Sequence, residues 1–135
     1  MSIVTKAALK AYFETGDFPT QTQFGNLIDT LYPYEKYSVL TLQSSTNAPT
    51  VRVLDNTLGG TVAWTYVSAG KYRATLAGVF TADKTFFVVH NSVLDQRTTV
   101  YWESANAFIV EVFTFAGAAA NDRITDMSLE VRVYP

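Results

Sequence analysis

Few side chains in this sequence are of a type that could do chemistry. It contains one histidine, His90, and no cysteine, so a metal site would have to rely on carboxylates and no thiolate chemistry is available. His90 follows four apolar residues, which favours a strand-end histidine with a structural hydrogen bond. A serine nucleophile would depend on His90, and no Gly-x-Ser-x-Gly elbow is present. We therefore expect no enzyme, no catalytic residue, no metal and no cofactor.

Two pairs of carboxylates are of a type that could do chemistry. Glu103 and Glu111 lie on neighbouring predicted strands and could approach each other as the two acids of a glycosidase do, but solvated or arginine-paired side chains are the favoured interpretation. Asp122 and Asp126 flank Arg123 in a predicted loop and could indicate calcium. Their spacing does not fit an EF-hand loop, so a role in capping turns is favoured.

A helical hairpin is predicted ahead of these residues. The first helix is expected over residues 6–14, with Thr5 as its N-terminal cap and Gly16 as a left-handed cap after its end. Thr20 and Gln23 have the spacing of a capping box, so a second helix should begin at position 21 and end before the proline at 33. Helices of this length are marginal alone in water, so each must pack on something. Their apolar stripes form a predicted docking face, made of Tyr12, Phe13, Phe24, Leu27, Ile28 and Leu31.

The hairpin lacks the charge that a DNA reader needs. The predicted second helix has no lysine or arginine, and its only charged residue is Asp29. The ten basic residues of the chain are scattered, and the formal net charge is −2. No apolar run approaches the ~20 residues of a membrane span, and the first residues lack the pattern of a secretory signal. We expect neither a nucleic-acid nor a membrane partner.

After the hairpin, the hydrophobic period changes from helical to alternating. Turn-rich segments separate eight short predicted strands, which cover residues 37–43, 50–54, 61–67, 71–77, 84–90, 97–103, 107–115 and 127–134. The predicted fold is mainly β with a short N-terminal helical hairpin. The β part is expected to be an antiparallel β-sandwich, with a jelly roll as one form. The predicted domains are the hairpin, 1–34, and the sandwich, 35–135.

Some predicted strands are apolar on both faces. In the segment FFVVH, Phe87 and Val89 oppose two further apolar residues, and Phe113 and Phe115 belong to a second such strand. One face of a sandwich sheet is normally solvated, so a two-sided strand indicates a second cover. The hairpin and a neighbouring subunit are equally good candidates for that cover. We expect Phe87, Val89, Phe113 and Phe115 to form an oligomer interface.

The N-terminal segment TKAALKAYFETGDFPTQTQFGNLIDTLY resembles a module with the pattern K-x-x-L-K-x-Y-F-x-T-G-D-x-P-T-x-x-Q-F-x-x-L-I-D-S. This module occurs at the start of virion and prophage structural proteins from phages of Bacteroidetes-type bacteria. The segments TLQSSTNAPTVRVLDNTLGG and NDRITDMSLEVRVYP are similar to β-domains of such proteins. The matching positions of the module are Leu9, Lys10, Tyr12, Phe13, Thr15, Gly16, Asp17, Pro19, Thr20, Gln23, Phe24, Leu27, Ile28 and Asp29.

The resemblance implies a setting rather than a reaction. Its members are virion components such as capsid decorations, head fibres and tail-associated proteins, made in the host cytoplasm and often oligomeric. It implies other virion proteins as partners and a homo-oligomer, with a trimer favoured over a dimer. The alternative is a carbohydrate- or receptor-binding module, in which exposed aromatic rings stack on sugars. The aromatic candidates for that role are Trp64, Tyr66, Tyr101 and Trp102.

Overall fold

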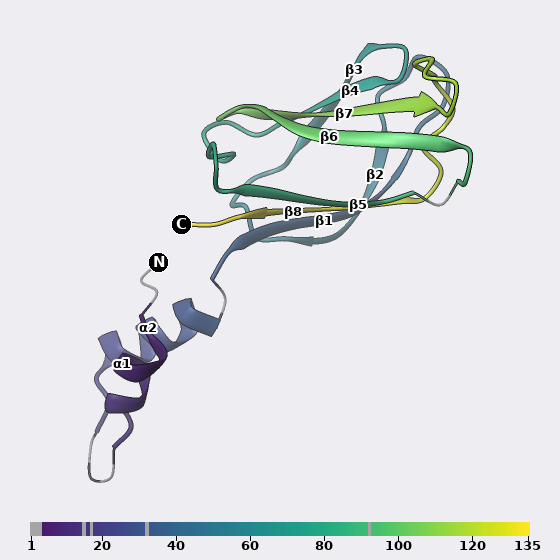
Figure 1. Cartoon of the computed structure of the whole chain (residues 1–135). Coiled ribbons are helices and arrows are strands. Elements are labelled where there is room, and N and C mark those ends of the chain that lie inside the picture. The colour runs from purple at the N-terminus through teal and green to yellow at the C-terminus, as the bar shows by residue number, and fades with distance from the viewer. Residues whose placement is uncertain (1–3, 15, 17, 32, 92) are drawn as a thin grey trace. The chain divides into compact units, whose positions relative to one another are not determined.

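The structure is a computed structural model that describes residues 4–14, 16, 18–31, 33–91 and 93–135. The chain divides into two compact units, one formed by residues 1–34 with 134–135 and the other by residues 35–133. The first unit contains two short helices and the second contains eight strands (Figure 1). The prediction of a mainly β protein with an antiparallel sandwich is confirmed.

The first helix, α1 (Lys6–Ala11), is shorter than the sequence predicts. The Thr5 hydroxyl accepts a hydrogen bond from the Ala8 N–H at 3.2 Å, as a cap should. At the other end, the N–H groups of Tyr12 and Phe13 bond to carbonyls three residues back. These tighter bonds end the α-helix before residue 14. Gly16 does have a positive φ of 95°, but it lies beyond the helix and does not cap it.

The second helix, α2 (Gln21–Leu31), begins with the predicted capping box. The Thr20 N–H donates to Gln23 Oε1 at 2.7 Å, and the Gln23 N–H donates to Thr20 Oγ1 at 3.3 Å. Two backbone donors at the helix start are thereby satisfied by side chains. The spacing of Thr20 and Gln23 therefore located this boundary correctly.

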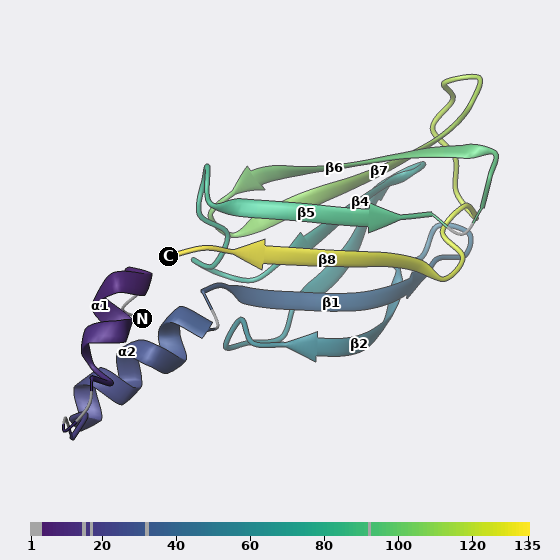
Figure 2. The ribbon, with the colours of Figure 1, turned by 60° about the horizontal axis from the view of Figure 1, so that its bottom comes forward.

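Eight strands form two antiparallel sheets of four. They are β1 (Glu35–Leu42), β2 (Thr50–Asn56), β3 (Ala63–Ser68), β4 (Lys71–Thr75), β5 (Thr85–His90), β6 (Gln96–Ser104), β7 (Ala107–Thr114) and β8 (Met127–Val133). The first sheet, called sheet A, has the order β2-β1-β8-β5, which Figure 2 shows face on. The second, sheet B, has the order β3-β4-β7-β6.

The connections are those of a sandwich built from hairpins. The chain neighbours β1 and β2, β3 and β4, and β6 and β7 each pair within one sheet. In a jelly roll most successive strands alternate between sheets, so the jelly-roll form of the prediction does not describe this order. The two sheets face each other across the core, with β6 and β7 in one layer and β8 and β1 in the other (Figure 1).

The core lies between the sheets and is rich in aromatic rings. Phe108 on β7 is fully buried, and its ring is 5.7 Å from Trp64, 5.1 Å from Phe80 and 5.3 Å from Phe87. Strand β8 alternates strictly, with buried residues at every odd position from 127 to 133. This period-two pattern is what fixes the register of a strand with one face in the core.

Candidate functional site

The predicted docking face of the hairpin is only partly used within its own unit. Phe13 and Phe24 meet edge to face with ring centroids 5.8 Å apart, and the Asn26 side chain donates to the Tyr12 hydroxyl at 3.3 Å. Leu27 is partly buried, like Tyr12. These contacts hold the two helices together.

The rest of that face is open. Ile28 is 58% exposed and Leu31 is 64% exposed, and both fully described helices contain no buried residue. Phe18, in the turn between the helices, is 95% exposed and was not among the predicted docking residues. Its position next to the proline of the turn identified it only as a loop residue. Exposed apolar side chains grouped on one small element are typical of a binding surface.

In β5, the outward side chains are not the ones predicted for an interface. Phe87 and Val89 pair with Val131 and Leu129 of β8 and pack against the core. Their neighbours Phe86 and Val88 face outward and are 54% and 43% exposed. The sequence could not decide between the two faces, because both are apolar and only the pairing with the alternating strand β8 orients them.

The outer face of sheet B supplies its own cover. Ile109 on β7 points outward, yet it is only 1% exposed because it lies between its register partners Arg73 on β4 and Tyr101 on β6. Long polar side chains can cover apolar surface with their stems while their charged ends stay in water. The second cover expected for this strand is thus provided here by neighbouring side chains rather than by a helix or a subunit.

Phe113 and Phe115, the other predicted interface residues, lie at the far end of this face. Phe113 is partly buried, and the Arg97 guanidinium lies 5.4 Å from its ring centroid, within the range of a cation–π contact. Phe115 follows the strand and is 73% exposed. Of the four predicted interface residues, Phe115 is therefore the one that presents its side chain most openly.

The two carboxylates considered as a glycosidase pair are each held by a cation. Glu103 receives two hydrogen bonds from Arg73, and Glu111 contacts Lys71 Nζ at 2.9 Å and accepts from the Tyr101 hydroxyl at 2.9 Å. These hydrogen bonds, led by those from Arg73 and Lys71, lower the pKa of both glutamates from the usual 4.5. The general acid of a glycosidase needs a raised pKa. The lowered pKa values therefore fit side chains paired with cations better than a glycosidase pair.

The four aromatic residues considered for sugar stacking are engaged elsewhere. Trp64 donates from Nε1 to the Tyr37 hydroxyl at 3.1 Å, Tyr66 accepts from Asn121, and both rings pack against the core. Tyr101 is bonded to a glutamate on the outer face of sheet B. Trp102 is 41% exposed, and its indole N–H donates to the Phe80 carbonyl at 2.8 Å. They do not share one exposed platform.

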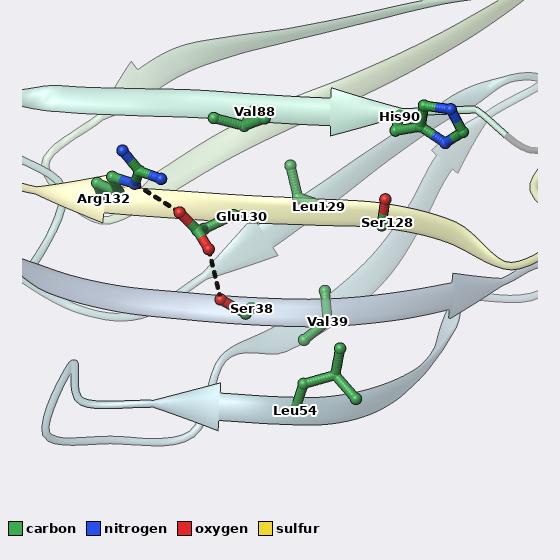
Figure 3. A pocket seen from close by; sticks show the side chains of 9 residues that line it. All are labelled: Ser38, Val39, Leu54, Val88, His90, Ser128, Leu129, Glu130 and Arg132. Carbon is green, nitrogen blue, oxygen red and sulfur yellow. Dashed lines mark hydrogen bonds and ion pairs between the residues drawn. The ribbon is translucent and has the colours of Figure 1, made fainter.

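The outer face of sheet A contains a shallow depression of about 290 Å³ that His90 lines at one end (Figure 3). Ser128 is the register partner of His90, but among the described residues no hydrogen bond joins the two side chains. The carboxylate nearest in register, Glu130, accepts from the Ser38 hydroxyl at 3.1 Å and from Arg132 Nε. These hydrogen bonds lower the pKa of Glu130, and the bond from Arg132 has the larger effect. The carboxylate in this depression, that of Glu130, is therefore ionised and paired with Arg132. Among the described residues that line the depression, no serine, histidine and acid are linked by hydrogen bonds as they are in a hydrolase.

The loop carboxylates act as turn formers. Asp122 and Asp126 have positive φ angles of 59° and 47°, and Asp122 accepts a hydrogen bond from the Ser45 N–H. Arg123, between them, contacts Asp95 at 2.8 Å rather than either neighbour. Within the described part of the chain, no group of three or more acidic or histidine side chains is placed to hold a metal ion. No helix in that part is long and apolar enough to cross a membrane.

Comparisons of the chain with protein-family models, with curated proteins and with solved structures give no match.

Proposed function

We propose that this protein is a non-enzymatic structural component of a phage virion that acts by docking to other proteins. The observation that carries the proposal is the open face of the hairpin. Ile28 and Leu31 lie on the same side of α2 and are more than half exposed, while Phe13 and Phe24 already hold the two helices together. The exposed residues are therefore not needed for the hairpin contact.

Burying the side chains of Ile28 and Leu31 against a partner would remove apolar surface from contact with water. Complete burial of one aliphatic side chain contributes about 1.5–3 kcal/mol, before the entropy cost of association. The helices themselves are short, with 6 and 11 residues, so a partner would also stabilise their fold. A groove that accepts an amphipathic helix is the kind of partner that this face fits.

The setting in a virion rests on the sequence resemblance of the N-terminal module. The hairpin and the sandwich form separate compact units, which supports a division between an attachment element and a β domain. The paired carboxylates support the non-enzymatic part of the proposal, because Glu103, Glu111 and Glu130 already have cationic partners.

The experiment that tests this division is the removal of residues 1–34. If the hairpin is an attachment element, the remaining chain should stay soluble, keep its β-type circular dichroism and unfold cooperatively. It should, however, be absent from purified virion particles. Aggregation of the truncated chain would indicate instead that the hairpin belongs to the core. That result would count against the proposal.

A further inference from the structure

The sandwich has four edge strands, namely β2 and β5 in sheet A and β3 and β6 in sheet B. An edge strand presents unpaired backbone N–H and C=O groups, and proteins usually protect it with bulges or charged side chains. The pairings of β2, β3 and β6 each contain a register shift of the kind a bulge produces. Strands β2 and β6 also carry charged residues, such as Arg52 and Glu103. Three of the four edges are therefore protected.

Strand β5, all of whose residues are described, is the exception. Its pairing with β8 runs from Thr85 to His90 without a register shift, and it contains no Asp, Glu, Lys or Arg. Phe86 and Val88 point away from the core and are 54% and 43% exposed. A regular edge that has apolar side chains on both faces and no Asp, Glu, Lys or Arg is a template for pairing with another strand.

We propose that β5 pairs antiparallel with β5 of a second copy of this chain. The partner is a second copy because the strand is complementary to itself: an edge without Asp, Glu, Lys or Arg meets an identical edge, and Phe86 and Val88 on one copy meet the same apolar side chains on the other. The antiparallel order β2-β1-β8-β5 then continues into the second copy, and two four-stranded sheets become one of eight strands. This interface goes beyond the proposed docking role, because it uses the sandwich and not the hairpin.

The twofold axis would stand perpendicular to sheet A. The outer faces of both sheets then lie on the same side, and Phe86 and Val88 of each copy form one continuous apolar strip across the junction. Aromatic and β-branched side chains are a favourable combination across antiparallel strands. A six-residue strand pair is a small interface, so the association should be weak in dilute solution and stronger where an assembly holds copies close together.

Sedimentation of the full-length chain with single substitutions in the sandwich tests the pairing. Val88→Lys places a charge on the outward face of β5 without entering the core, and Leu54→Lys is its match on the opposite edge, where the side chain is 59% exposed. The wild type should show a monomer–dimer equilibrium based on the 14.9 kDa chain between about 1 μM and 1 mM. Val88→Lys should associate at least about tenfold more weakly because both copies carry the new charge. Leu54→Lys should match the wild type.

Cross-linking provides a second readout that does not depend on a charged substitution. Because the chain has no cysteine, Val88→Cys and Leu54→Cys each introduce a single thiol. A short bis-maleimide should join two chains through position 88 and not through position 54. A wild type that stays monomeric throughout the range, a trimer of the kind that the sequence resemblance favours, an undiminished association of Val88→Lys, or equal cross-linking at both positions would each overturn the proposal. None of these results depends on the hairpin, so they leave the proposed docking function to its own test.

Discussion

The guanidinium of Arg73 on β4 and the carboxylate of Glu103 on β6 form two hydrogen bonds, of 2.8 and 2.6 Å, across the strand β7 that separates them. Ile109 of β7 pairs in register with Arg73 and is only 1% exposed. The ion pair therefore lies over an apolar residue on the outer face of the sheet. Its importance for stability should come from the surface it covers more than from its charges, because exposed ion pairs are worth little.

Substitution of Arg73 should separate these two contributions. Arg73→Met keeps an apolar stem over Ile109 and removes the ion pair, whereas Arg73→Ala removes both. We expect thermal unfolding to show a clearly lower Tm for Arg73→Ala and a smaller change for Arg73→Met. Equal Tm values for the two variants would mean that the stem of Arg73 does not protect Ile109.

The stability of the sandwich should fall in acid. Glu103, Glu111 and Glu130 all have pKa values lowered below 4.5 in the folded chain, in each case first by a hydrogen bond from a neighbouring cation. Their contribution to the free energy of unfolding is therefore complete above 4.5, the pKa of a glutamate in the unfolded chain. It is lost as the pH falls through the lower pKa values of the folded chain. Urea unfolding between pH 7 and acid should show this decline. A variant with all three changed to glutamine should show a shallower decline, and an unchanged slope would contradict the assignment.

The orientation of β5 predicts opposite results for two adjacent phenylalanines. Phe87→Ala removes a ring packed 5.3 Å from Phe108 and should cost roughly 3 kcal/mol in the free energy of unfolding. Phe86→Ala, on the 54% exposed face, should change it by about 0.5 kcal/mol or less at protein concentrations where the chain is monomeric. Chemical denaturation at low concentration measures both. A larger loss from Phe86→Ala would reverse the assignment of faces.

The turn between β3 and β4 depends on a glycine that no other residue can replace easily. Gly70 has a φ of 66°, and a Cβ at this position would lie 2.4 Å from the Val112 carbonyl oxygen and 2.7 Å from the Ala120 nitrogen. Gly59 also has a positive φ, of 78°, but has no atom within 4 Å of such a Cβ. Gly59→Ala should therefore show only the conformational cost of about 1–2 kcal/mol, and Gly70→Ala distinctly more. Similar losses of stability would show that the turn can move away from β7.

The local features of the fold could be predicted from the sequence, and the features set by pairing could not. The caps at Thr5 and Thr20 and the eight strands follow from nearby residue types, so their positions were predicted to within a few residues. The inward face of β5 was not, because Phe86 and Phe87 are equally apolar and only the neighbouring strand distinguishes them. The cover over Ile109 also depends on residues from three strands, which no single stretch of sequence brings together.

The proposed function requires that the open face of the hairpin attach this protein to a virion. The most direct measurement is quantitative mass spectrometry of particles purified from the host strain that carries the gene, with the wild type, an Ile28→Lys/Leu31→Lys variant and Leu54→Lys as the matched sandwich control. All three proteins should be folded and equally abundant in the cells. We expect particles to contain the wild type and the control but not the hairpin variant. Particles without the wild-type protein, or with the hairpin variant at the wild-type level, would contradict the proposed function.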